Sequence, residues 1–497
     1  MNFSRRSLLG MGAASLATLP SLSFASGSAP SRKKPKNIIY CVSDGMPLSI
    51  ATLVSTYHQS RHGKLSPWME LMTDPEAVNG AQKTSSLSSL VTDSAAASSS
   101  WGSGVHIWNG AINMLPDGRP LKSLFQLLQP KGVLTGLVTT ATITHATPAG
   151  FSINSQKRDD EPGIARRYLE LQPHVLMGGG ARFFLSTSRT DRKDLPAEFQ
   201  KQGYTYVKNR RELLDAKGGK LLGLFSPSHM PYTIDVLNTP GMTLSTPTLA
   251  EMSKAAIREL SKGSNGFLLQ IEGAKIDHAG HANDIGAMIY EQIAFEEAVK
   301  AALEFAREDG ETLVIVTADH CTGGPALNGI GSEYGDSTAA LDKVFGFTSS
   351  QGPMFDAIGS KPTAADVQGI VESKMSIKLS TEEAAFVASV ANGEKAGPGF
   401  SGDKGAALAT VLKKYTGIGW TSQNHTSDHT LVTAFGPGAD SFGGYTENIS
   451  HFGKILSAWG MKHTNPTMTF AEGKVHMEKK AALNSDDELS AWHDELI

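Results

Sequence analysis

Three short apolar segments, far apart in the chain, each run directly into an acidic residue. They are Ile38–Ser43 before Asp44, Phe267–Ile271 before Glu272, and Leu313–Ala318 before Asp319. Because the carboxyl ends of parallel strands meet at one edge of a sheet, we expect these acids to converge there. A single strand that ends in an acid is usually explained by a turn or a helix cap. Three such endings with neighbouring histidines are much harder to explain in that way.

The rest of the chain alternates short apolar runs with longer segments of helical spacing. The clearest strands are expected at Asn37–Ser43, Val133–Thr139, Gly266–Ile271, Thr312–Thr317 and Thr430–Phe435. Helical spacing is found at Thr248–Lys262 and Tyr290–Glu308. This alternation predicts an α/β fold in which a mostly parallel central sheet carries helices on both faces.

Changes in composition predict the organisation of the 497-residue chain. Residues 1–25 are expected to be a signal peptide, 26–36 a polar linker rich in Ser, Pro and Lys, and 37–461 the folded domain. The stretch from about 323 to 421 is rich in Gly and Ser and has weaker strand signals, which indicates an inserted cap region over one end of the sheet. Residues 462–497 form a charged tail without a cluster of candidate site residues.

The first 25 residues resemble a twin-arginine signal peptide. Arg5 and Arg6 precede a weakly apolar stretch that reaches Leu19, and small residues end the segment at Ala25. The stretch is too short and too rich in Gly, Ala and Ser to span a bilayer. The alternative is an ordinary amphipathic first helix. We therefore expect export by the twin-arginine route to the periplasm or outside the cell, with no membrane anchor.

Charge and cysteine content argue against several classes of function. A formal charge of −4, from 45 basic and 49 acidic residues, gives no support for nucleic acid as a dedicated partner. Two cysteines, Cys41 and Cys321, are too few for a disulfide scaffold. Buried apolar thiols are the preferred interpretation, and a disulfide between them remains open.

The second acidic motif continues into a segment rich in possible metal ligands. Asp277 and His281 are four residues apart, so one helical turn places both on the same face. A carboxylate and an imidazole suit zinc, although such a pair alone is more often an exposed ion pair. Asp319 and His320 are two adjacent candidate ligands. His425 adds an imidazole, and it is weak evidence alone because another histidine follows four residues later.

Two further segments could bind or attack an anion. Small residues follow Ser94, as at the amino terminus of a helix, where free N–H groups and the dipole favour negative charge. Taken alone, this segment is better explained by Asp93 or Ser94 as a helix N-cap. His145 and Thr147 precede Arg158, whose guanidinium could hold two phosphoryl oxygens. The alternative for Arg158 is a solvated surface charge.

Together these motifs resemble those of the alkaline phosphatases in order and spacing. The motifs are Asp44-Gly45-Met46, Asp93-Ser94-Ala95-Ala96, His145-Ala146-Thr147-Pro148-Ala149, Glu272-Gly273-Ala274 with Asp277 and His281, Thr317-Ala318-Asp319-His320, and His425-Thr426. The resemblance runs from about Asn37 to about Trp459. It implies an alkaline-phosphatase-like fold and a catalytic domain that hydrolyses small phosphate monoesters.

The resemblance also implies the metal ligands and the catalytic residues. One zinc ion would be held by Asp277, His281 and His425, a second by Asp44, Asp319, His320 and Ser94, and a magnesium ion by Asp44, Thr147 and Glu272. Ser94 would be the nucleophile that becomes phosphorylated, and Arg158 would hold the substrate phosphate. A homodimer is left open.

The chain departs from the best-known bacterial pattern at four positions. His145 stands where that pattern has Asp, and His278 where it has Lys. An imidazole at position 145 removes a hard oxygen ligand, so the identity of the third metal stays open. Ser98 and Ser99 replace the usual small residue and Thr, and we expect them to affect helix packing more than chemistry.

Three alternatives remain. A related metallophosphodiesterase often uses Thr as nucleophile and lacks the third site, whereas Ser94, Thr147, Glu272 and Arg158 together favour monoesters. A sulfatase would need a Cys/Ser-x-Pro-x-Arg setting, which Ser94 lacks. A non-catalytic metal or phosphate binder would keep the ligands but would not need a nucleophile.

Overall fold

The computed structural model describes residues 34–395, 397, 400 and 402–483. The signal peptide predicted at 1–25 lies outside the described residues, as does most of the linker predicted at 26–36. The twin-arginine interpretation therefore stays a prediction. The description below concerns only the folded unit that begins at Lys34.

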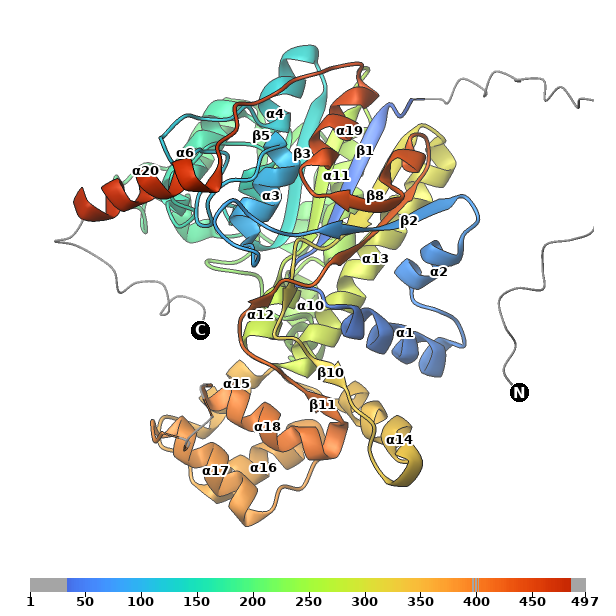
Figure 1. The fold of residues 1–497 in the computed structure, drawn as a ribbon, viewed down its shortest axis with the longest axis vertical. Helices are drawn as coiled ribbons and strands as arrows, with labels where there is room; N and C mark the ends of the chain where they lie inside the picture. The colour runs from blue at the N-terminus through green and yellow to red at the C-terminus, as the bar shows by residue number, and fades with distance from the viewer. Residues whose placement is uncertain (1–33, 396, 398–399, 401, 484–497) are drawn as a thin grey trace, which may run out of the picture. The chain divides into compact units, whose positions relative to one another are not determined.

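A ten-stranded sheet forms the centre of this unit (Figure 1). The strands lie in the order β14 (Gly444–Glu447), β2 (Ala77–Lys83), β13 (Thr430–Phe435), β8 (Thr312–Thr317), β1 (Asn37–Ser43), β7 (Phe267–Gly273), β3 (Leu134–Thr142), β4 (Val175–Gly179), β6 (Lys220–Leu224) and β5 (Tyr204–Val207). Only β13 runs antiparallel to its neighbours; the other pairs are parallel. The predicted mostly parallel sheet is confirmed.

Both faces of the sheet are covered by helices, because its central strands are apolar on both sides. Along β1, Ile39 and Cys41 belong to one buried cluster, and Ile38, Tyr40 and Val42 belong to the other. Helices α1 (Leu48–His62), α11 (Leu249–Leu260) and α13 (Ile285–Asp309) pack in the first cluster. Helices α3 (Ser94–Ser103), α4 (Leu124–Leu128), α6 (Glu161–Leu171) and α19 (Ser450–Ala458) pack in the second. The two layers hold the central strands away from water.

Each strand predicted from the sequence is present, three of them with the predicted bounds. Those three are β1, β8 and β13, whereas β3 and β7 are shifted by one to three residues. Strand β14, at one edge of the sheet, and its neighbour β2 were not among the predicted strands. Their residues are largely exposed or half-buried, so neither strand shows the apolar run that marks a buried strand.

A helical lobe occupies much of the stretch predicted as an inserted cap, and it lies at one end of the sheet (Figure 1). It contains α14 (Ser337–Asp342), α15 (Gln351–Ile358), α16 (Ala364–Met375), α17 (Thr381–Ala391) and α18 (Lys404–Thr416). Strands β10 (Ala326–Leu327) and β11 (Ile418–Gly419) pair antiparallel where the chain enters and leaves the lobe. Capping boxes at Thr363 and Ser380 show that some of its polar residues begin helices. The predicted domain bounds stay a prediction.

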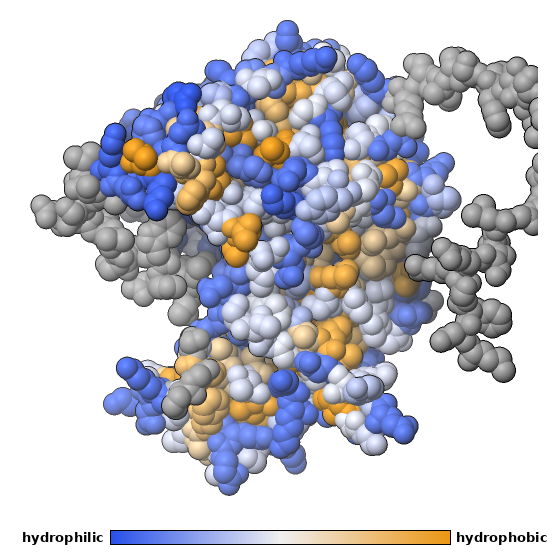
Figure 2. Space-filling model, in the orientation of Figure 1, coloured by the Kyte–Doolittle hydropathy of each residue, from blue (hydrophilic) through white to orange (hydrophobic). Residues whose placement is uncertain are grey.

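Cys41 and Cys321 are both buried and unpaired, as the preferred interpretation of the sequence expects. The tail contains helix α20 (Phe470–Leu483) before the described residues end. Among the described helices, none is both long and apolar enough to cross a bilayer. The face drawn in Figure 2 carries apolar side chains in scattered groups among polar ones.

Candidate active site

The three acids that follow the apolar segments lie together at the carboxyl edge of the sheet. Strand β1 pairs with β7 through Ser43 and Gly273, and with β8 through Val42 and Thr317. This register places Asp44 beside the end of β7, where its N–H donates to the Gly273 carbonyl at 3.3 Å. The N–H of the next residue, Gly45, donates to Asp319 Oδ1 at 3.0 Å. The expected convergence of the acids is thus confirmed.

A first group of possible metal ligands combines one carboxylate with two imidazoles. Helix α12 (Lys275–His281) places Asp277 and His281 one turn apart, as their spacing predicts. His281 Nε2 lies 3.3 Å from Asp277 Oδ2 and 3.0 Å from His425 Nε2. The ligand atoms of Asp277, His281 and His425 all lie within 4.8 Å of one another. This geometry can hold one metal ion.

Backbone carbonyls fix the orientation of both imidazoles in this group. His281 Nδ1 donates to the Gln423 carbonyl at 2.6 Å, and His425 Nδ1 donates to the Thr92 carbonyl at 2.8 Å. These bonds leave both Nε2 atoms as acceptors that face one another. A histidine held in this way through one ring nitrogen is typical of metal ligation through the other. The neighbouring His429 is exposed and bonds Tyr445 instead.

A second group surrounds His320, which is fully buried. Its Nε2 lies 3.1 Å from Asp319 Oδ2, 3.7 Å from Asp44 Oδ1 and 3.2 Å from the hydroxyl oxygen of Ser94. Asp277 also lies near this group, with Oδ1 at 4.0 Å from His320 Nδ1. The ring of His320 stacks on that of His425 with centroids 3.6 Å apart, so the two groups are adjacent.

A third group lies on the other side of Asp44. Ligand atoms of Asp44, His145 and Glu272 come within 4.8 Å of one another. Thr147, in helix α5 (Ala146–Gly150), donates its hydroxyl to Asp44 Oδ2 at 3.3 Å. Asp44 therefore belongs to both the second and the third group. Every residue predicted as a metal ligand lies in one of the three groups.

The buried carboxylates of these groups carry negative charge that bound cations could compensate. Asp44 Oδ1 and both carboxylate oxygens of Glu272 are buried, and no described residue donates a hydrogen bond to them. Burial, followed by the charge of Asp319, raises the pKa of Asp44, and burial raises that of Glu272 to about 7. Buried anions without partners are costly unless a cation compensates them. These residues therefore fit bound metal ions.

Ser94 is the first residue of helix α3 and is buried. The side chain of Asp93 caps the helix by accepting from the Ala96 N–H at 2.8 Å, as the capping interpretation of the sequence predicts. The Ser94 hydroxyl faces His320, at the edge of the second group. The same segment thus provides both a helix cap and a hydroxyl beside the possible metal ligands.

Arg158 is directed into the site, with only about a fifth of its side chain exposed. Its Nη1 donates to Asp93 Oδ2 at 3.1 Å, and its Nη2 donates to His145 Nε2 at 3.1 Å. Although burial alone would lower the pKa of Arg158, the Asp93 carboxylate raises it. The alternative of a solvated surface charge is therefore wrong. The guanidinium can hold an anion beside Ser94.

Three residues at the site were not foreseen as part of it. Asp93 binds Arg158 besides capping α3, and Gln423 orients His281. His229 follows β6 and packs its ring against His278, with centroids 4.5 Å apart, and also lies 6.0 Å from the ring of His145. His229 Nδ1 accepts from the Thr142 N–H, and burial lowers its pKa to about 4. No motif marks His229, because it lies in a loop of ordinary composition.

Comparison with known proteins agrees with this geometry. The family model for alkaline phosphatase matches residues 35–461. The chain belongs to the alkaline phosphatase family. Alkaline phosphatase 3 of Bacillus subtilis (strain 168) is 34% identical over 468 residues, which cover 89% of this chain and 96% of that protein. As a member of the family, the chain is a metal-dependent enzyme that hydrolyses phosphate monoesters.

Solved structures of alkaline phosphatases share the fold. The crystal structure from Thermus thermophilus superposes with a TM-score of 0.85 at 32% identity, covering 93% of this chain and all of that one. A variant of the alkaline phosphatase from the Antarctic bacterium TAB5, with a histidine replaced by aspartate, has a TM-score of 0.62 at 26% identity. It covers 87% of this chain and all of that one, and it is described with Mg bound in the M3 site.

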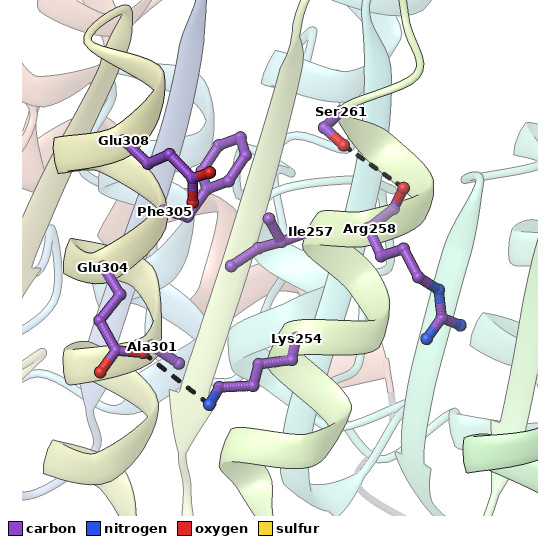
Figure 3. Close-up of a pocket in the computed structure, with 8 residues that line it drawn as sticks. All are labelled: Lys254, Ile257, Arg258, Ser261, Ala301, Glu304, Phe305 and Glu308. Carbon is purple, nitrogen blue, oxygen red and sulfur yellow. Dashed lines mark hydrogen bonds and ion pairs between the residues drawn. The ribbon is translucent and has the colours of Figure 1, made fainter.

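A separate groove lies between helices α11 and α13 (Figure 3). Figure 3 shows Ile257 and Phe305 between the two helices, with the ion pair of Lys254 and Glu304 across the groove. The lining residues lie near the carboxyl ends of both helices, which lead to the amino ends of β7 and β8. The groove therefore lies toward the end of the sheet opposite the candidate site and shares none of its residues.

Gln423 gives a test of the way the first group is oriented. Its side-chain Nε2 donates to the His281 carbonyl at 2.9 Å and to Asp403 Oδ1 at 3.1 Å. Gln423→Leu keeps the size but removes both bonds, so the segment that orients His281 should loosen. We expect Zn²⁺ affinity, measured by competition with a chelator, to fall about tenfold. Asn424→Ala, at the exposed neighbouring side chain, is the control. Equal affinities of the two variants would contradict the orienting role.

Proposed function

We propose that this alkaline phosphatase acts through a phosphoserine intermediate on Ser94, at a centre of two zinc ions and one magnesium ion. The position of the Ser94 hydroxyl supports the proposal most directly. It lies 3.2 Å from His320 Nε2, and it stands at the amino terminus of a helix, where a phosphate is favoured. In the proposal Ser94 and Arg158 are the catalytic residues.

The types of donor atom support the choice of metals. Asp277, His281 and His425 offer one oxygen and two nitrogens, a set that suits zinc. Asp44, Asp319, His320 and Ser94 would hold the second zinc ion. Asp44, Thr147 and Glu272 offer only oxygens, which suit magnesium.

His145 bears on the identity of the third metal. Its ring lies beside Asp44 and Glu272, so it belongs to the proposed third site. The relative from TAB5 that is described with Mg in its M3 site carries aspartate in place of a histidine. Oxygen ligands favour magnesium, and an added imidazole increases the affinity of a site for zinc. The oxygens of Asp44, Thr147 and Glu272 support magnesium as the third metal, whereas a bond from His145 would favour zinc at the same position.

In the proposed reaction, Ser94 is the nucleophile and Arg158 holds the phosphoryl group. When bound, the metals would lower the pKa of a hydroxyl group or of water and would stabilise negative charge on oxygen. The Ser94 oxygen attacks phosphorus, and the bond from phosphorus to the alcohol oxygen breaks, which gives phosphoserine and the free alcohol. Water then attacks the phosphoserine, which releases inorganic phosphate and restores Ser94. Arg158 holds two phosphoryl oxygens during both steps.

We further propose that the protein acts in the periplasm or outside the cell. The observation behind this part of the proposal is the pair Arg5-Arg6 before a short apolar stretch. Twin-arginine export carries folded proteins, so the metals could be bound before translocation.

Replacing Ser94 by alanine tests the nucleophile. Ser94→Ala removes one oxygen and leaves the other ligands of the second group in place. We expect a folded protein that binds metal but forms no phosphoenzyme when incubated with labelled substrate at low pH. Ser100→Ala, in the same helix, should form phosphoenzyme as the wild type does. Labelled phosphate on a residue other than Ser94 would refute the assignment.

Arg158→Ala tests whether the site is built for monoesters. A monoester dianion offers two terminal oxygens to the guanidinium, whereas a diester offers one oxygen fewer and carries a bulky group there. Loss of one partner of a desolvated charge pair costs about 2–5 kcal/mol. We expect kcat/KM for monoesters to fall about 30-fold or more, weaker inhibition by phosphate, and a smaller loss for diesters. Equal losses for both substrates would favour a diesterase.

The export proposal is tested by its two arginines. Replacing Arg5 and Arg6 by lysine changes the signal without changing its charge. Because the pair is read by a receptor, we expect the precursor to stay in the cytoplasm and to be active there once supplied with metal. Cell fractionation and immunoblotting measure the distribution. Normal export of the double variant would exclude the twin-arginine route.

A further inference from the structure

Helix α3, which carries Ser94, packs directly against helix α5, which carries Thr147. Glycines at the crossing allow this approach: a Cβ atom on Gly150 would lie 2.6 Å from Ser98 Cβ, and one on Gly102 would overlap the Gly150 carbonyl. Ser98 and Thr147 are both fully buried at this contact. The two helices therefore hold the proposed nucleophile and a proposed ligand of the third metal at a fixed separation.

The carbonyl oxygen of Thr147 is bound by two side chains. Ser98 donates its hydroxyl to this oxygen at 2.6 Å, and Gln270 donates its Nε2 at 3.2 Å. Thr147 lies inside α5 although Pro148 follows it, and a residue before proline disfavours the helical conformation. The two bonds thus stabilise a backbone conformation that the local sequence opposes. Ser98 makes the shorter of the two.

The conformation of Thr147 determines where its hydroxyl points. That hydroxyl lies 3.3 Å from Asp44 Oδ2, in the third group of possible ligands. A shift of the Thr147 backbone would carry its Cα, and with it the hydroxyl, away from Asp44. A magnesium ion needs near-ideal octahedral geometry, so its binding is sensitive to a displaced ligand.

We propose that Ser98 is a positioning residue for the third metal, through its hydrogen bond to the Thr147 carbonyl. The inference rests on the proposed function, in which Thr147 is a ligand of that metal. It replaces the expectation from the sequence that Ser98 affects packing more than chemistry. Through this bond, the helix that carries the nucleophile also determines the geometry of the magnesium ligand.

The chain offers a matched control within the same helix. Ser100 is also fully buried, but its hydroxyl donates to the Ala96 carbonyl, one turn earlier in α3, at 2.9 Å. Ser98→Ala and Ser100→Ala each remove one buried hydroxyl from α3, and only the first removes a bond to Thr147. If both hydroxyls served only packing, the two variants should change the Kd for Mg²⁺ to a similar extent.

The test measures Mg²⁺ affinity and stability together. Mg²⁺ is titrated calorimetrically into the full-length protein loaded with two equivalents of Zn²⁺ and no free zinc, and the free energy of unfolding is measured by denaturant. We expect Ser98→Ala to raise the Kd for Mg²⁺ about tenfold, as the loss of an outer hydrogen bond to a ligand does. Ser100→Ala should change it less than twofold at comparable stability. Ser98→Cys, which keeps the volume but donates only weakly, should resemble Ser98→Ala and serves if that variant does not fold.

Thr147→Val tests whether Thr147 is a ligand of the third metal, separately from the role of Ser98. This variant removes the proposed ligand oxygen and keeps the shape, so it should weaken Mg²⁺ binding more than Ser98→Ala does. If Thr147→Val weakens binding and Ser98→Ala does not, the positioning role of Ser98 is wrong and the proposed ligand set stands. If Thr147→Val leaves the Kd unchanged, the ligand assignment itself fails, and the inference fails with it.

Discussion

Mutual repulsion among four buried carboxylates is the constraint on which the site depends. Asp44, Glu272, Asp277 and Asp319 are at most 3% exposed, and they meet at one edge of the sheet. His281 and His320 lower the pKa values of Asp277 and Asp319 against the effect of burial, whereas burial raises the pKa values of Asp44 and Glu272. An arrangement of this kind is stable only with added positive charge, which divalent metals supply.

The fold places these ligands with little freedom to move. Three of the acids lie at the ends of adjacent buried strands, whose register fixes their spacing. The imidazoles of His281 and His425 are held by backbone carbonyls, and the guanidinium of Arg158 is held by Asp93, itself fixed as the cap of α3. Few side chains must therefore reorder when metal and phosphate bind, and this reduces the entropic cost of binding.

The sequence predicts those parts of the site that depend on local pattern. The strand at Asn37–Ser43 follows from a continuous apolar run, and the shared face of Asp277 and His281 follows from the helical period of about 3.6 residues. Contacts between distant segments leave no such signal, and for that reason Gln423 and His229 were not foreseen. Strands β2 and β14 were missed because exposed or half-buried strands lack an apolar run. Spacing along the chain marked Asp277, His281, Asp319 and His320 as candidate ligands. The division of the candidates among three metals came from the resemblance, since a lone histidine such as His425 carries little information.

His145 links the guanidinium of Arg158 to the third group of possible ligands. A guanidinium has only donors, so His145 Nε2 must accept the bond from Arg158 Nη2. A neutral imidazole has one acceptor nitrogen, and burial, followed by the charge of Arg158, keeps the pKa of His145 well below its usual range. Its proton therefore resides on Nδ1 whenever the bond to Arg158 is present. The same ring lies with Asp44 and Glu272 in the third group of possible ligands, so the hydrogen bond to Arg158 and a bond to a metal would both draw on the one neutral imidazole.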